Sequence, residues 1–407
     1  MTYIPLYILL LGFIIAIDYI FGLGIQNASN KTKKRRLFYG AILMHLLFFL
    51  VFKYLPLLQT IIEDLCGLVS IVYVPKQLSI LVPVGLSFHI FQSMSYLIEV
   101  YTGRWIPEKN PLVIGLYCMF YPQLMAGPIE RPAHLLPQIK QTHTFNYGSF
   151  VEGTVRVLWG IAKKTIIADH IAILIDPIFY PPVYGNGMTV WISALLFSIQ
   201  IYADFSGYTD IALGTAKALG FSLSENFSLP YLATSMNDFW KRWHHSLTSW
   251  FRDYLYIPLG GNRYGMMRTV IHIIIVFTIS GIWHGATYSF ILWGMVNGVL
   301  LSLEKIYEHY VKIQVPPQFV APIRIFQWMG TYTLISLVWI LFRAPTLEDA
   351  MQLYRAIFSL QSGTSAITPM QLVPVGAAIL ACSCAEYMYS IHSVYVKISR
   401  APYILKF

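Results

Sequence analysis

The chain is poor in charged residues. Only 12% of its 407 residues are Asp, Glu, Lys or Arg, whereas 56% are hydrophobic. A soluble globular domain carries about 25% charged residues, so this composition excludes an ordinary soluble fold and indicates a membrane protein. The net charge of +9 arises largely from basic residues in short loops such as 31–36. This is the positive-inside pattern of membrane proteins, and we expect no nucleic-acid partner.

Cysteine is also scarce, and several catalytic motifs are missing. The four cysteines, at positions 66, 118, 382 and 384, have the spacing of neither a disulfide framework nor a metal site. The sequence has no GxSxG elbow, no P-loop and no glycine-rich dinucleotide fingerprint. We therefore expect no metal centre, no tightly bound cofactor and no energy coupling through a phosphate-binding loop.

Long apolar runs are what the chain has in abundance. A transmembrane helix needs about 20 apolar residues. Clear candidate spans are residues 4–25, 37–58, 270–291, 292–306, 325–341 and 372–388, and interrupted ones are 78–100, 111–125, 155–178 and 190–213. Charges at membrane depth must be shielded by protein or line a wet cavity. We predict an all-α integral membrane protein with about nine to eleven spans plus short re-entrant or interfacial helices.

The sequence also predicts topology and domain organisation. The first apolar run is too long for the apolar region of a signal peptide, and no small-residue cleavage site follows it. We expect a retained span with the N-terminus outside and loop 31–36 in the cytoplasm. No internal repeat divides the chain, so we expect a single membrane-embedded domain over residues 1–407.

Two segments with histidines are the most informative motifs. They are residues 239–247, FWKRWHHSL, and residues 280–286, SGIWHGA. A neutral imidazole is the usual proton-transfer group near pH 7, and an ionisable residue inside a transmembrane segment is a candidate functional residue by default. The small residues around His284 allow close approach of another helix or a thin substrate. His284 is the first catalytic candidate, and the alternative is a buried histidine bonded to a backbone carbonyl.

His244 is the second candidate. On a helical wheel, residues 239–255 form one amphipathic helix with an aromatic face and a basic face, as at a membrane interface. His244 lies at the edge of the aromatic face, so we expect it to point into protein, in an active-site or a packing role. His245 lies on the basic face and is expected to meet water or headgroups. Because no HExxH-type spacing is present, we expect no metal site at His244, His245 and His284.

These segments and several others resemble the membrane-bound O-acyltransferase family, in particular its bacterial alginate O-acetylation branch. The similar blocks are residues 82–88, 91–96, 121–129, 163–169, 204–210, 252–263 and 341–344. The resemblance covers about residues 40–345. Asn297 stands where relatives often carry histidine, and the N-terminal region is shorter than in many relatives.

The resemblance implies a function. His284 would act in acyl transfer from a cytoplasmic thioester donor, acetyl-CoA or another acyl thioester, to a hydroxyl, and His244 would be its catalytic companion. The acceptor would be an exported or cell-envelope polysaccharide, alginate-like or peptidoglycan. The protein would lie in the inner or plasma membrane and relay the acyl group across it. A separate periplasmic or extracellular acetyltransferase of the serine-hydrolase type is expected as a partner.

Three alternatives stay open at this stage. The D-alanylation branch would move D-alanine to teichoic acid, although block 258–263 resembles the polysaccharide-acetylating branch instead. A transporter without bond-making chemistry would explain scattered intramembrane charges, but not the paired histidine segments or the absence of repeats. A protein-lipidating acyltransferase is disfavoured on the same motif grounds. The sequence identifies neither the acceptor glycan nor the oligomeric state.

Overall fold

A computed structural model describes residues 7–73, 85–124, 127–180, 186–311, 316–359, 367–368 and 370–381, together with Cys384 and Tyr387. Within these ranges the chain forms helices and no β-strand, which confirms the all-α class. Parts of the predicted spans 78–100 and 372–388, and of the family-like blocks 82–88 and 121–129, lie outside the described residues. So do Cys382 and His392.

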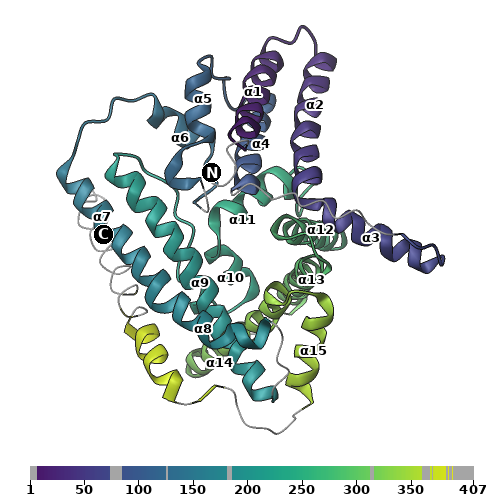
Figure 1. Ribbon diagram of the computed structural model, residues 1–407, viewed down its shortest axis with the longest axis vertical. Coiled ribbons are helices and arrows are strands. Elements are labelled where there is room, and N and C mark those ends of the chain that lie inside the picture. Colours follow the sequence, from purple (N-terminus) through teal and green to yellow (C-terminus); the bar gives the residue numbers. More distant parts are fainter. Residues whose placement is uncertain are drawn as a thin grey trace.

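The chain forms helices from its N-terminal to its C-terminal part (Figure 1). The α-helices are α1 (Tyr7–Gln26), α2 (Lys31–Phe49), α3 (Leu55–Leu68), α4 (Leu86–Thr102), α5 (Pro111–Cys118), α6 (Pro132–Ile139), α7 (Tyr147–Ala162), α8 (Asp169–Phe179), α9 (Gly187–Ala218), α10 (Met236–Arg242), α11 (His245–Phe251), α12 (Met266–His284), α13 (Tyr288–Tyr310), α14 (Pro317–Arg343) and α15 (Leu347–Phe358). Three π-helical turns, at Leu50–Tyr54, Lys163–Ala168 and Arg252–Tyr256, follow α2, α7 and α11.

Six helical segments of the described residues are long and apolar enough to cross a membrane. They are Tyr7–Gln26, Lys31–Leu68, Gly187–Ala218, Met266–His284, Tyr288–Tyr310 and Pro317–Arg343. The protein is therefore a multi-pass membrane protein. The described part of the interrupted run 111–125 yields the short α5 and a 3₁₀ turn at Tyr121–Gln123, whereas the run 155–178 becomes part of α7 and α8, which are joined by a π-helical turn.

One predicted span has the wrong bounds. Residues 270–291 do not form a single helix, because α12 ends at His284 and α13 begins at Tyr288. Gly285, between them, has an extended backbone, with φ −158° and ψ 159°. Hydropathy alone could not find this break, since the apolar pattern continues through it.

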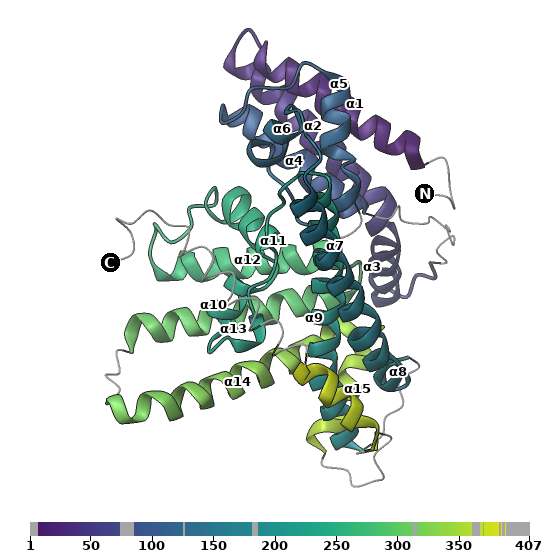
Figure 2. The same ribbon diagram turned by 90° about the vertical axis from the view of Figure 1, so that its left-hand side faces the viewer.

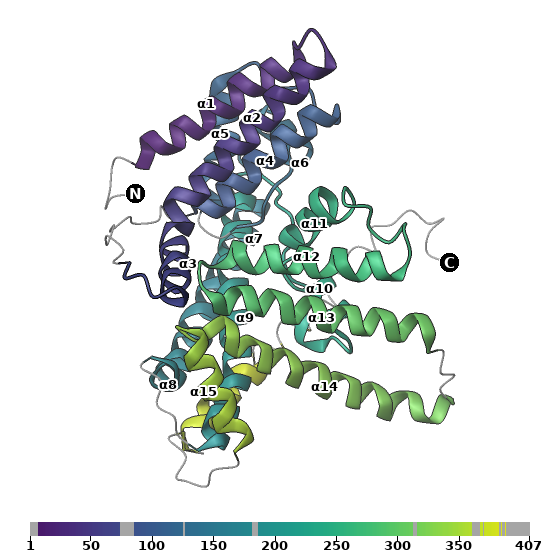
Figure 3. The same cartoon turned by 90° about the vertical axis from the view of Figure 1, so that its right-hand side faces the viewer.

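The helices form two groups joined by α7 and α9. The N-terminal group contains α1, α2, α4, α5 and α6, and its core includes Tyr96, Leu97 and Tyr117. Figure 2 and Figure 3 show α12, α13 and α14 running side by side as three successive layers in the other group. The short helix α11 lies between the N-terminal group and α12, whereas α10 lies at the level of α12 and α13 (Figure 3) and packs against α13. This arrangement places the first histidine segment beside the end of α12.

Helices α7 and α9 make an unusually close contact. A Cβ atom on Gly160 would lie 2.5 Å from the Gly207 carbonyl oxygen, and one on Gly153 would lie 2.4 Å from the Gly214 carbonyl oxygen. The glycines recur every seven residues on both helices, so the same faces meet twice. Small residues allow this backbone approach in membrane helices.

Ion pairs surround the α7–α9 contact. Lys163 Nζ lies 2.5 Å from Asp210 Oδ2, and Lys164 Nζ lies 2.8 Å from Asp204 Oδ1. Arg156 Nε donates to Asp210 Oδ1 at 2.9 Å, and the Arg156 guanidinium also donates to the Glu225 carboxylate. Charges that interrupted the apolar pattern therefore find partners on the neighbouring helix, as charges shielded from water require.

A polar cluster around Glu130 holds the segment before α6 in place. The Glu130 carboxylate is buried; it accepts a hydrogen bond from the Ser224 backbone N–H at 2.6 Å and pairs with His134 Nδ1 at 2.6 Å. The hydrogen bond to Glu130 raises the pKa of His134 above its ordinary value. This cluster joins the loop before α6 to the segment that precedes α10.

We predict that this pair makes stability depend on pH. Because the folded-state pKa of His134 is raised, its contribution is fully present below the unfolded value of about 6.5 and is lost as pH rises through the folded pKa. The thermal midpoint of wild type should exceed that of His134→Gln at pH 6 and approach it at pH 9. The effect should be small because the His134 side chain is 42% exposed. The same substitution in a Glu130→Gln background should show a difference that does not vary with pH; a pH-dependent difference there would contradict the assignment.

Candidate active site

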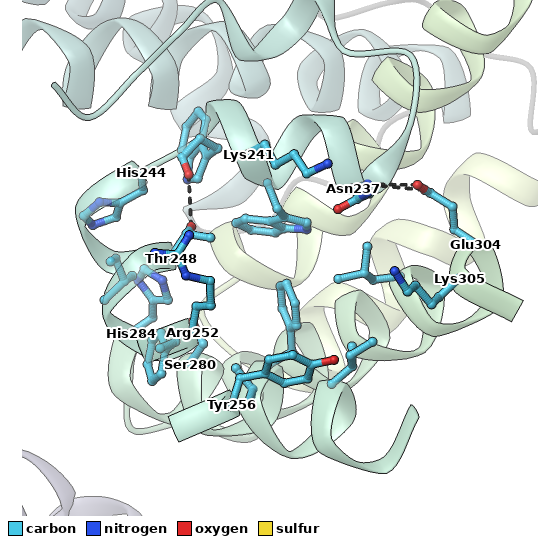
Figure 4. Close-up of a pocket in the computed structure, with 18 of the residues that line it drawn as sticks. Asn237, Lys241, His244, Thr248, Arg252, Tyr256, Ser280, His284, Glu304 and Lys305 are labelled. Atoms are coloured by element: carbon cyan, nitrogen blue, oxygen red, sulfur yellow. Dashed lines mark hydrogen bonds between the residues drawn. The ribbon is translucent and has the colours of Figure 1, made fainter. Parts of the chain in front are cut away.

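A cavity of about 330 Å³ lies between α10, α11, α12 and α13. Both predicted catalytic histidines, His244 and His284, contribute to its lining. Figure 4 shows them at one end of the cavity, with Asn237, Glu304 and Lys305 toward the other end. Two segments separated by about forty residues in the sequence thus meet at one site.

His284 is the last residue of α12 and faces an aromatic wall. Its imidazole makes edge contacts with Trp293 of α13, at a ring-centroid distance of 5.1 Å, and with Phe342 of α14, at 5.2 Å. No hydrogen bond to this imidazole is found within the part of the chain that the structure describes. Its nitrogens are therefore available to a molecule in the cavity.

The small residues around His284 serve helix packing. A Cβ atom on Gly281 would lie 2.2 Å from the Phe290 carbonyl oxygen, and one on Gly294 would lie 2.3 Å from the Phe277 carbonyl oxygen. Of the two uses that the sequence suggested, close approach of another helix is the one that these glycines show. The contact brings α13, and with it Trp293, against His284.

His244 has a backbone that the single-helix prediction for residues 239–255 did not foresee. That prediction is wrong, because α10 ends at Arg242 and α11 begins at His245. His244 lies between them in the left-handed region, with φ 47° and ψ 58°. A non-glycine residue in this region is uncommon and marks a turn held by its surroundings.

The His244 side chain lies inside the protein, as the sequence predicted. The residue is 2% exposed, and its ring contacts those of Phe88, at a centroid distance of 6.3 Å, and Phe205, at 4.7 Å. Burial, and then the neighbouring His284 and His245, lower the pKa of His244 well below its ordinary value. His244 is therefore a neutral imidazole at neutral pH. His245, expected to meet water or headgroups, is partly exposed, although its Nε2 is shielded from solvent.

Sequence reasoning missed Asn226, which holds the turn at His244. Its side chain is fully buried, and its backbone and side-chain oxygens contact His244, His245 and Ser246. A single asparagine in a polar loop carries no distinctive sequence signal. Only the tertiary structure brings it to the histidine.

Lys53 and Tyr54 were also missed, although an ionisable residue in the apolar run 37–58 was an available signal. They lie at the π-helical turn after α2. Lys53 Nζ donates to the Trp283 carbonyl oxygen, and also to Ser87 Oγ at 2.9 Å, while the Tyr54 hydroxyl donates to the Ile282 carbonyl oxygen at 3.0 Å. The last turn of a helix has carbonyls without partners in the helix itself. Lys53 and Tyr54 therefore fix the end of α12 that carries His284.

We predict that Lys53→Met loosens this helix end. Losing a charged donor to a shielded carbonyl should destabilise the protein by about 1–3 kcal/mol and lower any activity that depends on His284. Thermal unfolding of the protein in detergent measures the first effect. Lys53→Arg should retain part of the stability, and Lys109→Met, in an exposed loop, is the control. A Lys53→Met protein that unfolds at the wild-type temperature would contradict the assignment.

The opposite end of the cavity is polar. The Glu304 carboxylate, on α13, accepts hydrogen bonds from the backbone N–H groups of Met236 at 2.7 Å and Asn237 at 3.2 Å. It therefore caps the start of α10, where N–H groups lack helical partners and negative charge is favoured. Lys241 and Lys305 line the same end of the cavity (Figure 4).

The family of this chain follows from comparison with known proteins. Residues 109–343 match the model of MBOAT, the membrane-bound O-acyltransferase family. This match includes both histidines and all of the residues that line the cavity. The chain belongs to the membrane-bound O-acyltransferase family.

Several named proteins are similar to this chain. It is 38% identical to a probable alginate O-acetylase AlgI of Azotobacter vinelandii over 305 residues, which are 74% of this chain and 59% of the relative. It is 33% identical to a peptidoglycan O-acetyltransferase of Helicobacter pylori over 311 residues, 70% of this chain and 58% of the relative. It is 28% identical to a teichoic acid D-alanyltransferase of Bacillus subtilis over 244 residues, 56% of this chain and 60% of the relative. The chain thus spans less than two thirds of the length of each.

Proposed function

We propose that this protein is an O-acyltransferase that moves an acyl group, in the simplest case acetyl, from a thioester donor to a hydroxyl. The observation that carries the proposal is the meeting of His244 and His284 in one cavity inside a membrane protein. The His244 Nε2 atom is buried without a hydrogen-bond partner in the described part of the chain. An unpartnered buried acceptor is costly to keep, and a proton-bearing substrate would satisfy it.

The proposed chemistry uses the histidines as proton carriers. A nitrogen of His284 takes the proton of the acceptor hydroxyl as its oxygen attacks the thioester carbonyl. The C–O bond of the new ester forms, the C–S bond breaks, and the proton returns from His284 to the departing sulfur. His244 orients the acceptor or shares the proton. The aromatic side chains around both rings exclude water, which would otherwise compete for the thioester.

The proposed donor and acceptor follow from the family and its named members. Acetyl-CoA, or another acyl thioester made in the cytoplasm, is the donor substrate. The acceptor is an exported or cell-envelope polysaccharide, as in the alginate and peptidoglycan O-acetylating relatives. D-alanyl transfer is the second candidate, supported by the lower identity to a teichoic acid D-alanyltransferase.

The proposal includes a place in the cell and a partner. The protein works in the bacterial inner or plasma membrane and passes acyl groups outward. A periplasmic or extracellular acetyltransferase of the serine-hydrolase type completes transfer to the polysaccharide. Support for this partner comes from the family resemblance, not from a surface of this chain.

The experiment is an ester analysis of cells. Base-labile esters in the cell-envelope and exopolysaccharide fractions are identified by mass in cells with the wild-type chain and with His284→Ala at matched membrane abundance. Loss of acetate in the variant supports O-acetylation, and the depleted fraction names the acceptor. Loss of D-alanine instead would show that the transferred acyl group is D-alanyl and not acetyl. No change in any ester would overturn the acyltransferase proposal and leave a transporter as the better explanation.

A further inference from the structure

Asn226 contacts three consecutive residues at the turn between α10 and α11. Its backbone oxygen accepts a hydrogen bond from the His245 N–H at 2.9 Å. Its side-chain Oδ1 accepts one from the Ser246 N–H at 3.2 Å. These N–H groups belong to the first turn of α11, where helical partners are missing. Asn226 thereby stabilises the left-handed backbone of His244, a conformation that is unfavourable for a non-glycine residue when left unsupported.

The orientation of the Asn226 amide follows from these contacts. The Ser246 N–H is a donor, so the Asn226 atom facing it must be the oxygen and not the NH₂ group. The same Oδ1 lies 3.4 Å from His244 Nδ1. An acceptor at that position favours the tautomer in which Nδ1 carries the proton. A neutral imidazole has only one N–H, so Nε2 is left as an acceptor.

The Nε2 atom of His244 is buried and has no partner among the described residues. The Phe88 and Phe205 rings that flank it offer no hydrogen bond to this nitrogen. The titratable groups acting on His244 are His284 and His245, and Glu225 acts in turn on His245. Glu225 is itself paired with Arg156. No carboxylate in the described structure lies within ion-pairing distance of His244, so the amide of Asn226 is what orients its ring.

We propose that Asn226 is the positioning residue of the active site: it holds His244 in its left-handed turn and fixes the tautomer with Nδ1 protonated and Nε2 bare. The bare Nε2 is then the atom that accepts a substrate proton or a substrate hydrogen bond. This role in catalysis rests on the proposed acyltransferase function, whereas the tautomer assignment does not. Asn226 itself touches no reacting atom.

The test is solid-state NMR of the wild-type protein in lipid bilayers, with ¹⁵N-labelled histidine rings. The signal of His244 is assigned by its absence in His244→Gln. At pH 7 the expected state is a protonated Nδ1 and an unprotonated Nε2. An Nε2–H tautomer, or a charged ring, would overturn the inference. This measurement reads the tautomer whether or not the protein is active, so its outcome is separate from that of the proposed function.

A conservative variant tests whether Asn226 sets the protonation of the His244 ring. Asn226→Asp keeps an acceptor for Ser246 but places a carboxylate beside Nδ1, which favours the charged ring. The His244 ring should then stay positively charged to a higher pH. The rise in rate on the acidic side of the pH–rate profile should shift to higher pH by the same number of pH units. Asn146→Asp makes the same change at the start of α7, away from the histidines, and should alter neither. An unchanged His244 titration in folded Asn226→Asp would overturn the inference.

Removing the Asn226 amide measures how much this residue contributes to the acyl-transfer rate. Asn226→Ala should lower the acyl-transfer rate about 100-fold by misplacing His244, with a smaller change in donor KM. If Asn226→Ala does not fold, the Asn226→Asp titration still decides. If Asn226→Ala folds, transfers at the wild-type rate and shows an unchanged His244 signal, the residue has no positioning role.

Discussion

Replacing His284 by glutamine is expected to lower acyl transfer about 1,000-fold or more, within the range of a lost proton-transfer group. His244→Gln should cause a smaller loss. The double variant should be no slower than His284→Gln alone, because residues that act on one proton are strongly non-additive. The physical reason is that both imidazoles line the same cavity. The measurement is the initial rate of acetyl transfer in membrane vesicles, per folded protein.

The control for these variants is His309→Gln, at the exposed end of α13 and outside the cavity. It should transfer at the wild-type rate. His284→Gln should unfold within a few degrees of wild type, since His284 makes no hydrogen bond within the described structure. Two single effects that simply multiply in the double variant would contradict a shared proton pathway. A large fall in thermal midpoint for His284→Gln would point to a packing role instead.

Adding a side chain at the α7–α9 contact is expected to have the largest effect on folding. Gly160→Val should destabilise the protein by about 3 kcal/mol or more, because overpacking costs 1–3 kcal/mol even where atoms can move. Here the new Cβ would meet backbone, with the Gly207 carbonyl oxygen 2.5 Å away. Separation of the helices would also pull Lys163 from Asp210. The yield of monodisperse protein in detergent and its thermal midpoint are the measurements.

Gly330→Val is the matched control, because a Cβ at Gly330 of α14 has no atom within 4 Å among the described residues. It adds the same side chain to a membrane-spanning helix and should change the thermal midpoint little. Gly207→Val should resemble Gly160→Val, since its Cβ would lie 2.8 Å from the Gly160 carbonyl oxygen. A stable Gly160→Val protein would show that the helices separate at low cost and that the close contact is not needed.

The sequence anticipated much of the site because its signals were local. Apolar runs of span length do not depend on neighbours, so the all-α membrane class and most spans could be predicted from composition and periodicity. His284 was identified as an ionisable residue in an apolar segment, and His244 by its position on an aromatic face. Both line the cavity, as a shared site requires. The family resemblance rested partly on the same segments, and the match of residues 109–343 to the family model confirms it.

The features of the site that could not be predicted from the sequence depend on contacts between residues far apart in the chain. The helical wheel through residues 239–255 was wrong because Asn226, eighteen positions before His244, supplies the hydrogen bonds that break the helix there. Lys53 reaches the end of α12 across 230 positions, so no local pattern links it to His284.

By itself, the sequence determined the membrane environment and the helical class, and it pointed to the two histidines that line the cavity, since these follow from side-chain chemistry and short-range periodicity. Only the tertiary structure decided where α12 ends, which backbone His244 adopts and which groups support each imidazole. The reason is physical: a helix stops, and a left-handed residue persists, when hydrogen bonds from elsewhere in the fold outweigh the local helical preference.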